Sequence, residues 1–204
     1  MLNINTREDF TIIFNTLNYN LGTELGTYQG TFAKHILNNW NGNLICIDLF
    51  DREDNNDLLN STGFYKHNLP NKNLILPTFN HNTKSVKNNC LTIQSDTTNA
   101  AKFFPDNYFD FIYIDADHSY NAVLNDIINW YPKLKPKGLF AGHDFLNEFD
   151  YSQKNNEIYQ PYNKSEYVGT FGVNTAVTDF TNQYNIKFYT TNEPYWKSWY
   201  WFKP

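Results

Sequence analysis

Short apolar runs alternate along the chain with segments whose apolar residues recur three or four positions apart. The runs are typical of buried strands, and the spacing is typical of helices. Strands are predicted at 21–25, 43–50, 90–96, 109–114, 138–145, 186–190 and 198–202. Helices are predicted at 31–39, after Ser119 through Leu134, and at 173–184. This order predicts an α/β, Rossmann-like doubly wound fold with a mostly parallel seven-stranded sheet and an antiparallel edge strand.

The same pattern predicts one domain over residues 1–204, with two polar stretches that are longer than ordinary connections. These are residues 51–89 and 146–170, and both follow predicted strands on the side where ligands bind. Two interpretations stay open for them. They form a lid and a substrate wall, or they are surface loops without a ligand role.

Composition narrows the class of protein. With 41% hydrophobic and 18% aromatic residues, the chain can build a core. A net charge of −5 and only two arginines, Arg7 and Arg52, argue against a nucleic-acid partner and against an arginine clamp on phosphate. The sequence lacks an apolar run long enough for a membrane span, and its start lacks a signal-peptide pattern, so we expect a cytoplasmic protein. The oligomeric state is left open, a homo-oligomer included.

Acidic and imidazole side chains follow four of the predicted strands. Parallel strands bring their carboxyl ends to one edge of a sheet, so these side chains are expected to gather there. The carboxylates concerned are Glu24, Asp48, Asp96, Asp115, Asp117 and Asp144. Like charges in contact repel by about 1 kcal/mol per pair even in water. A cationic cofactor, a metal ion or both would offset that repulsion.

The stretch TELGTYQGTF places Glu24, Gly26 and Gly30 between a predicted strand and a predicted helix. Its Glu-x-Gly-x-x-x-Gly spacing resembles the first motif of class I S-adenosylmethionine-dependent methyltransferases, especially the catechol- and caffeoyl-CoA-type O-methyltransferases. The segment FDFIYIDADHSYNAVLNDIINWYPKLKPKGLFAGHDF resembles the macrocin-O-methyltransferase-like, or methyltransferase 24, group. The chain departs from that group at Lys137, where the group has a glycine, and at Gly22 and Thr23, where the group is usually more apolar.

The resemblance implies S-adenosylmethionine as the cofactor. Gly26 and Gly30, with Thr27 and Tyr28 between them, would let the backbone approach its methionine part, and Glu24 would fix the loop or the amine. A tight turn without a ligand is the alternative.

The same resemblance gives roles to residues after the next two strands. Asp48 resembles the carboxylate that binds both ribose hydroxyls; its spacing would also suit NAD, but the chain lacks the G-x-G-x-x-G fingerprint. Ser95 and Asp96 are candidate neighbours of the adenine, and a helix N-cap is the alternative for Asp96.

The resemblance also implies a divalent cation, Mg or Mn, held by Asp115, His143 and Asp144. His143 stands where the group has an aspartate, and imidazole suits manganese, iron or zinc better than magnesium. The alternatives are that Asp115 only touches the cofactor and that His143 is a base or a core residue. Asp117 matches the general-base position, with His118 or His143 as the base otherwise. For His118, packing at the start of a helix is the alternative.

These observations predict a methyltransferase that acts on a hydroxyl of a small molecule, a sugar included. A metal-dependent hydrolase that uses the Asp and His residues is one alternative, although it leaves the glycine motif without a role. A non-catalytic cofactor-binding protein of the same fold is the other.

Overall fold

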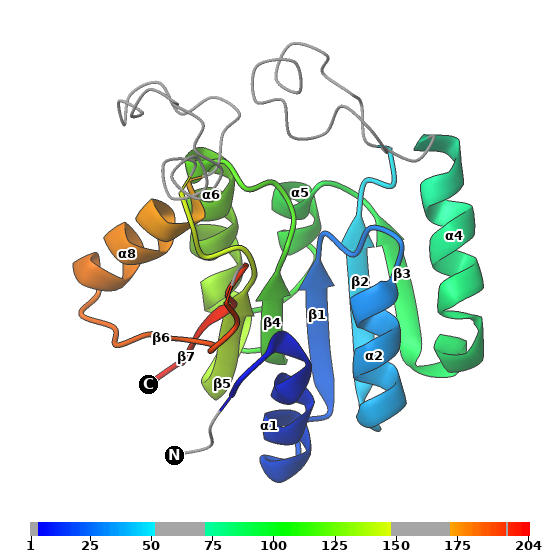
Figure 1. The fold of residues 1–204 in the computed structure, drawn as a ribbon, viewed down its shortest axis with the longest axis horizontal. Coiled ribbons are helices and arrows are strands. Elements are labelled where there is room, and N and C mark those ends of the chain that lie inside the picture. Colours follow the sequence, from blue (N-terminus) through cyan, green and yellow to red (C-terminus); the bar gives the residue numbers. More distant parts are fainter. Residues whose placement is uncertain (1–3, 52–71, 148–171, 195) are drawn as a thin grey trace.

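The computed structural model describes residues 4–51, 72–147, 172–194 and 196–204. Helices and strands alternate through most of this part of the chain (Figure 1). The α-helices are α1 (Phe10–Thr16), α2 (Thr31–Asn39), α4 (Ile75–Asn82), α5 (Thr97–Ala101), α6 (Tyr120–Trp130) and α8 (Val173–Gln183). The strands are β1 (Leu21–Leu25), β2 (Asn43–Asp48), β3 (Cys90–Gln94), β4 (Phe109–Ile114), β5 (Leu134–Gly142), β6 (Tyr189–Thr190) and β7 (Trp199–Phe202).

All seven strands form one sheet in the order β3-β2-β1-β4-β5-β7-β6. Strands β1 to β5 pair in parallel, whereas β7 is antiparallel to both β5 and β6. The predicted fold class is therefore confirmed. The strand order reverses between β1 and β4, and ligands of such open sheets bind outside the carboxyl ends of the strands at this reversal.

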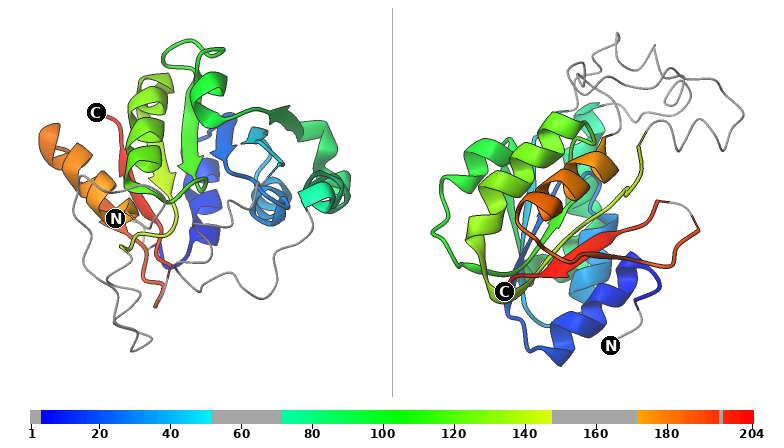
Figure 2. Two further views of the ribbon diagram at one scale, coloured as in Figure 1. Left: turned by 90° about the horizontal axis from the view of Figure 1, so that it is seen from above. Right: turned by 90° about the vertical axis from the view of Figure 1, so that its left-hand side faces the viewer.

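Helices cover both faces of the sheet because strand side chains alternate between the faces (Figure 2). Along β4, Ile112 and Ile114 pack against the buried side chains of α5, α6 and α8. Phe111 and Tyr113 pack on the other face with those of α1, α2 and α4. Two hydrophobic cores thus hold the strand ends at fixed positions.

The structure corrects several of the predicted elements and element bounds. The stretch 51–89 is not all loop, because α4 lies within it and buries Ile75 and Phe79 one helical turn apart. Leu134 belongs to β5 rather than to the preceding helix, and it pairs with Phe109. Neither α1 nor α5 was among the predicted helices. Residues 52–71 and 148–171 lie outside the described residues, so the lid interpretation of both stretches is not tested there.

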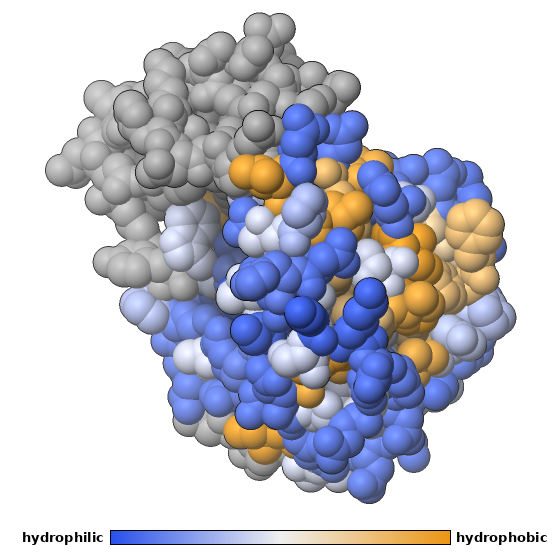
Figure 3. All heavy atoms as spheres, turned by 90° about the vertical axis from the view of Figure 1, so that its right-hand side faces the viewer, coloured by the Kyte–Doolittle hydropathy of each residue, from blue (hydrophilic) through white to orange (hydrophobic). Residues whose placement is uncertain are grey.

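The edge of the sheet at β3 keeps apolar surface in contact with solvent. Leu74 and Leu91 are 53% and 57% exposed at this end of the molecule. Figure 3 shows apolar side chains among polar ones on this face. No helix within the described ranges is long and apolar enough to cross a membrane.

Candidate active site

The turn between β1 and α2, residues 26–30, is called the glycine turn below. Gly26 and Gly30 have φ angles of +80° and +74°, a region that side chains disfavour. A Cβ atom at Gly26 would overlap the carbonyl oxygen of Asp115, and one at Gly30 would lie 2.6 Å from the Phe79 ring. The packing of the chain itself therefore requires both glycines, whether or not a ligand lies nearby.

Glu24 lies at the end of β1 and is 2% exposed. Its Oε2 atom accepts a hydrogen bond of 2.9 Å from the Thr27 hydroxyl. Burial, with a further contribution from the negative charge of Asp115, raises the pKa of Glu24 well above its ordinary value. Glu24 thus holds the glycine turn in place through its hydrogen bond with Thr27.

Asp48 ends β2 and holds two backbone segments. Its Oδ2 atom accepts from the Tyr28 N–H at 2.7 Å, and its Oδ1 atom accepts from the Phe50 N–H at 2.7 Å. Tyr28 itself has a φ of 48° and is 37% exposed. Asp48 therefore positions the glycine turn, and its role toward a ribose stays a prediction.

Asp96 is the N-cap of α5, which was the alternative to its adenine role. It accepts from the backbone N–H of Asn99 at 2.8 Å and from the Asn99 side chain at 2.7 Å. The backbone hydrogen bond from Asn99 is the main reason that the pKa of Asp96 is lowered. Ser95 donates its backbone N–H to the Asp48 carbonyl at 3.0 Å, so this segment lies beside the end of β2.

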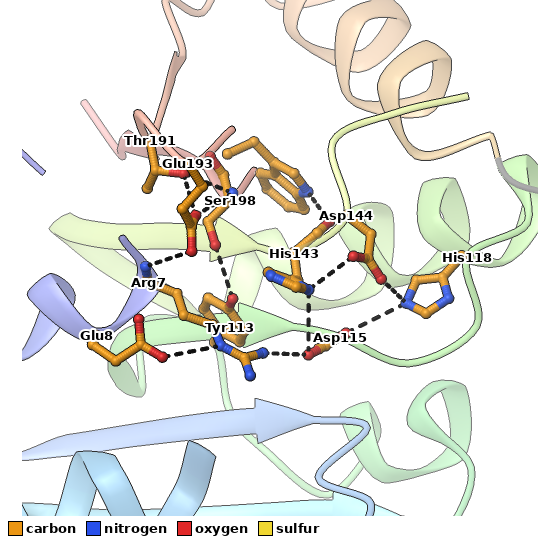
Figure 4. A network of polar contacts seen from close by, with 11 residues as sticks. Arg7, Glu8, Tyr113, Asp115, His118, His143, Asp144, Thr191, Glu193 and Ser198 are labelled. Carbon is orange, nitrogen blue, oxygen red and sulfur yellow. Dashed lines mark hydrogen bonds and ion pairs between the residues drawn. The ribbon is translucent and has the colours of Figure 1, made fainter. Parts of the chain in front are cut away.

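Asp115, His118, His143 and Asp144 come together beyond the ends of β4 and β5, and we call them the histidine–aspartate cluster (Figure 4). His118 Nε2 lies 2.9 Å from Asp144 Oδ2 and 3.3 Å from Asp115 Oδ1. His143 Nδ1 lies 2.9 Å from Asp144 Oδ1 and 3.9 Å from Asp115 Oδ2. Two carboxylates thus share two imidazoles.

Hydrogen bonding outweighs burial in the electrostatics of this cluster. Burial alone would lower the pKa of His118, but its contacts with Asp115 and Asp144 raise that pKa to about 10. Burial alone would raise the pKa of Asp144, yet hydrogen bonds from His118 and His143 hold it well below its ordinary value. His118 is therefore a cation at neutral pH, placed between two anions.

The predicted metal ligands differ from the set that lies closest together. Among the described residues, one group has donor atoms that all lie within 4.8 Å of one another, and it consists of Asp115, His118 and Asp144. His118 thus replaces His143 in the predicted set. Both imidazoles lie in the cluster, and sequence spacing does not show which of them lies between the carboxylates.

Asp117 lies outside the cluster. It is exposed, and its Oδ1 atom accepts from the Ser119 N–H at 2.7 Å. Ser119 in turn caps α6 by accepting from the Ala122 N–H at 3.4 Å. Of the six carboxylates predicted to gather, only Asp115 and Asp144 contact the same side chains, His118 and His143. The other four each accept hydrogen bonds from different groups.

Sequence reasoning gave Arg7 no role at the site. Its Nη1 atom lies 3.2 Å from Asp115 Oδ2, and its guanidinium carbon lies 4.8 Å from the centre of the Phe32 ring. The Arg7 backbone N–H donates to Glu193 Oε1 at 3.4 Å. Figure 4 shows this arginine reaching the cluster from the N-terminal segment. With just two arginines in the chain, their scarcity was the signal that could have drawn attention to it.

Comparisons with known proteins agree with this architecture. The structure resembles that of a candidate caffeoyl-CoA O-methyltransferase from Staphylococcus aureus, with a TM-score of 0.65 and 15% identity over 96% of this chain and 81% of that one. It also resembles the O-methyltransferase TomG from Streptomyces achromogenes, solved in complex with S-adenosylmethionine. That match has a TM-score of 0.62 and 8% identity over 97% of this chain and 79% of that one. A search of the curated proteins found no match.

A family model described as a methyltransferase domain, Methyltransf_24, matches residues 23–145. This segment is more than half of the 204 residues and runs from β1 to the end of β5. It includes the glycine turn and the histidine–aspartate cluster, and it agrees with the resemblance found in the sequence. The chain therefore belongs to the methyltransferase-domain family Methyltransf_24.

Proposed function

We propose that this protein transfers the methyl group of S-adenosylmethionine to a hydroxyl of a small molecule, with the acceptor bound at the histidine–aspartate cluster. One observation carries the proposal: His143 and Asp144 form a 2.9 Å pair beside the point where the strand order reverses. The glycine turn follows β1, which pairs with β4. The Asp115 N–H, just beyond β4, donates to the Leu25 carbonyl at 2.8 Å, so the ends of these two strands lie side by side. Donor and acceptor sites at these two places would be adjacent.

The reaction joins the acceptor oxygen to the methyl carbon as the carbon–sulfur bond breaks. The bonding electrons stay on sulfur, which gives S-adenosylhomocysteine, and the hydroxyl proton must pass to a base. Holding both reactants in line supplies much of the rate acceleration. The protein therefore needs to provide orientation and one proton acceptor.

His143 is the base in this proposal. Asp144 Oδ1 is positioned to accept a hydrogen bond from the protonated Nδ1 atom, which would leave Nε2 with a lone pair. A carboxylate that fixes the imidazole tautomer in this way also stabilises the imidazolium formed after proton transfer. The backbone carbonyl of His143 accepts from the Trp199 indole N–H at 3.1 Å, which holds the residue in place. His118, already protonated, would orient the two carboxylates rather than accept a proton.

The donor atoms of Asp115, His118 and Asp144 fit a divalent cation, because two carboxylates and an imidazole within 4.8 Å make a three-ligand set. A cation bound there would lower the pKa of the acceptor hydroxyl. His118 would first have to lose its proton, so binding of the cation would release one.

Two measurements test the proposal in sequence. Isothermal titration calorimetry with S-adenosylhomocysteine is expected to give micromolar affinity, and an absence of binding at millimolar ligand would contradict the cofactor. The protein is then incubated with methyl-labelled S-adenosylmethionine and a panel of sugars, polyols and catechols, with and without Mn²⁺, and labelled product is measured.

The matched variants are His143→Gln and His81→Gln. His143→Gln removes the proposed base and is expected to lower turnover at least a hundredfold, whereas His81 lies exposed on α4 and its replacement is expected to have no effect. Equal turnover in both variants would exclude His143 as the base. Hydrolysis of acceptor substrates without methyl transfer would favour the hydrolase alternative.

A further inference from the structure

We infer that Arg7 is a positioning residue that holds Asp115 by its Oδ2 atom and competes with a divalent cation for that carboxylate. The inference depends on the proposed transferase function for its catalytic meaning. Its test, however, requires neither turnover nor a known acceptor.

The position of Arg7 is determined by the backbone around it as well as by its charge. The N-terminal segment is joined to the loop before β7, because Asn192 donates its backbone N–H to the Asn5 carbonyl at 3.0 Å. The Asn192 side chain also donates to Asn5 Oδ1 at 3.0 Å. Glu193 Oε1 accepts a hydrogen bond from the backbone N–H of Arg7, and Glu193 Oε2 accepts one from the Thr191 hydroxyl at 2.5 Å. Contacts between two segments that are distant in sequence therefore position Arg7 beside the cluster.

The guanidinium is packed so that it remains beside Asp115. The Phe32 ring supports it at 4.8 Å, a cation–π distance. The Arg7 and Asp115 side chains are 26% and 20% exposed, so water screens their interaction only in part. Arginine stays charged at every pH at which the protein is folded. Asp115 thus has a permanent positive partner within the chain.

A divalent cation bound by Asp115 would meet this permanent charge. Two like charges a few ångströms apart in a partly buried site repel strongly. Arg7 contacts Asp115 Oδ2 at 3.2 Å while His118 contacts Oδ1 at 3.3 Å, so a cation would bind a carboxylate whose charge the guanidinium already offsets. Affinity for a cation in the wild-type protein is therefore expected to be lower than the Asp115, His118 and Asp144 donor set would give alone.

The test compares Mn²⁺ binding by electron paramagnetic resonance in the wild type and in Arg7→Met. Methionine keeps an apolar stem on Phe32, and the bond from the backbone N–H to Glu193 does not depend on the side chain. We expect Arg7→Met to bind Mn²⁺ at least tenfold more tightly than the wild type. A role of Arg7 in folding alone would not increase the affinity for a cation.

Three further variants define what the increase means. Lys133→Met removes one positive charge at a distant ion pair with Asp106, so it is expected to leave Mn²⁺ affinity unchanged. In Arg7→Met combined with Asp115→Asn the increase is expected to vanish. Arg7→Gln repeats the comparison if the methionine variant does not fold by circular dichroism.

Equal Mn²⁺ affinity in the wild type and both Arg7 variants would overturn the inference, and so would an increase that persists without the Asp115 charge. Calorimetry with S-adenosylhomocysteine on the wild type and Lys133→Met is expected to give equal affinities. If the wild type does not bind that ligand, the proposed function fails, while the Mn²⁺ comparison still decides the role of Arg7.

Discussion

The glycine turn and the histidine–aspartate cluster lie at the same edge of the sheet, but they are assembled differently. In the glycine turn, one short segment folds on itself: Thr27 bonds Glu24 three residues away, and Asp48 comes from the next strand. The cluster joins β4, β5 and the N-terminal segment, and the Arg7–Asp115 pair spans 108 residues. The first region therefore depends on backbone conformation and the second on charge balance. Substitutions that alter only one of these properties can break or sharpen the comparison.

The largest effect is expected where the cluster loses a charge. Asp144→Asn keeps the shape of the side chain and tolerates the φ of 53° at this position, but it leaves His118 without one of its two anionic partners. Removing one member of a buried ion pair costs about 4 kcal/mol of unfolding free energy. Urea unfolding at pH 7 measures the loss, and a loss below about 1 kcal/mol would mean that charge balance does not govern this region.

Gly26→Ala tests the other region. The new Cβ atom would overlap the backbone of Asp115, and the φ of +80° is unfavourable for alanine. The overlap and the backbone strain together are expected to lower the free energy of unfolding by about 3 kcal/mol, after allowing for the lower entropy of the unfolded chain. Gly30→Ala is the matched control. Its Cβ would lie 2.6 Å from the Phe79 ring, whereas the Cβ at Gly26 would overlap a backbone oxygen, so a smaller loss is expected.

Asp126 shows what happens when a buried carboxylate has a neutral partner. It is 3% exposed, accepts from the Thr97 hydroxyl, and burial raises its pKa to about 7. The folded state therefore binds this proton more tightly than the unfolded chain. Its stabilising contribution is complete below about pH 4 and is lost as pH rises toward 7.

Asp126→Asn is accordingly expected to stabilise the protein by about 2 kcal/mol at pH 8, about half of the full linkage value because the surroundings relax. At pH 4 the variant and the wild type are expected to unfold alike. Thermal unfolding at both pH values measures the difference. A pH-independent difference would show that Asp126 does not titrate in this range.

The smallest effect is expected at Lys137, where the sequence has lysine in place of the family's glycine. Its φ is +64°, a conformation that glycine adopts freely. Lys137→Gly is expected to raise the free energy of unfolding by about 0.5 kcal/mol, because the relief of backbone strain outweighs the entropic cost of ordering a glycine. Because Lys137 lies in the first half of β5, away from the end that leads to the cluster, affinity for S-adenosylhomocysteine is expected to stay unchanged.

The comparison also explains how far the sequence could predict this molecule. Periodicity and strand-end residues were sufficient for the fold class, because burial on both faces leaves continuous apolar runs such as Phe109–Ile114. The residues at the strand ends, together with the family resemblance, named Asp115, His118, His143 and Asp144, which all follow β4 or β5. Which imidazole lies between the carboxylates could not be predicted, because it depends on side-chain directions beyond the strand ends. Helix α4 was missed since its polar residues obscure two buried positions.

The contacts of Arg7 have a consequence for how this domain is divided. The family match begins at residue 23 and ends at residue 145, so it contains neither Arg7 nor Glu193. Those bounds include the glycine turn and all four members of the cluster but leave out the guanidinium that pairs with Asp115. A comparison of relatives over the matched bounds alone would therefore overlook a positive charge that acts directly on the cluster.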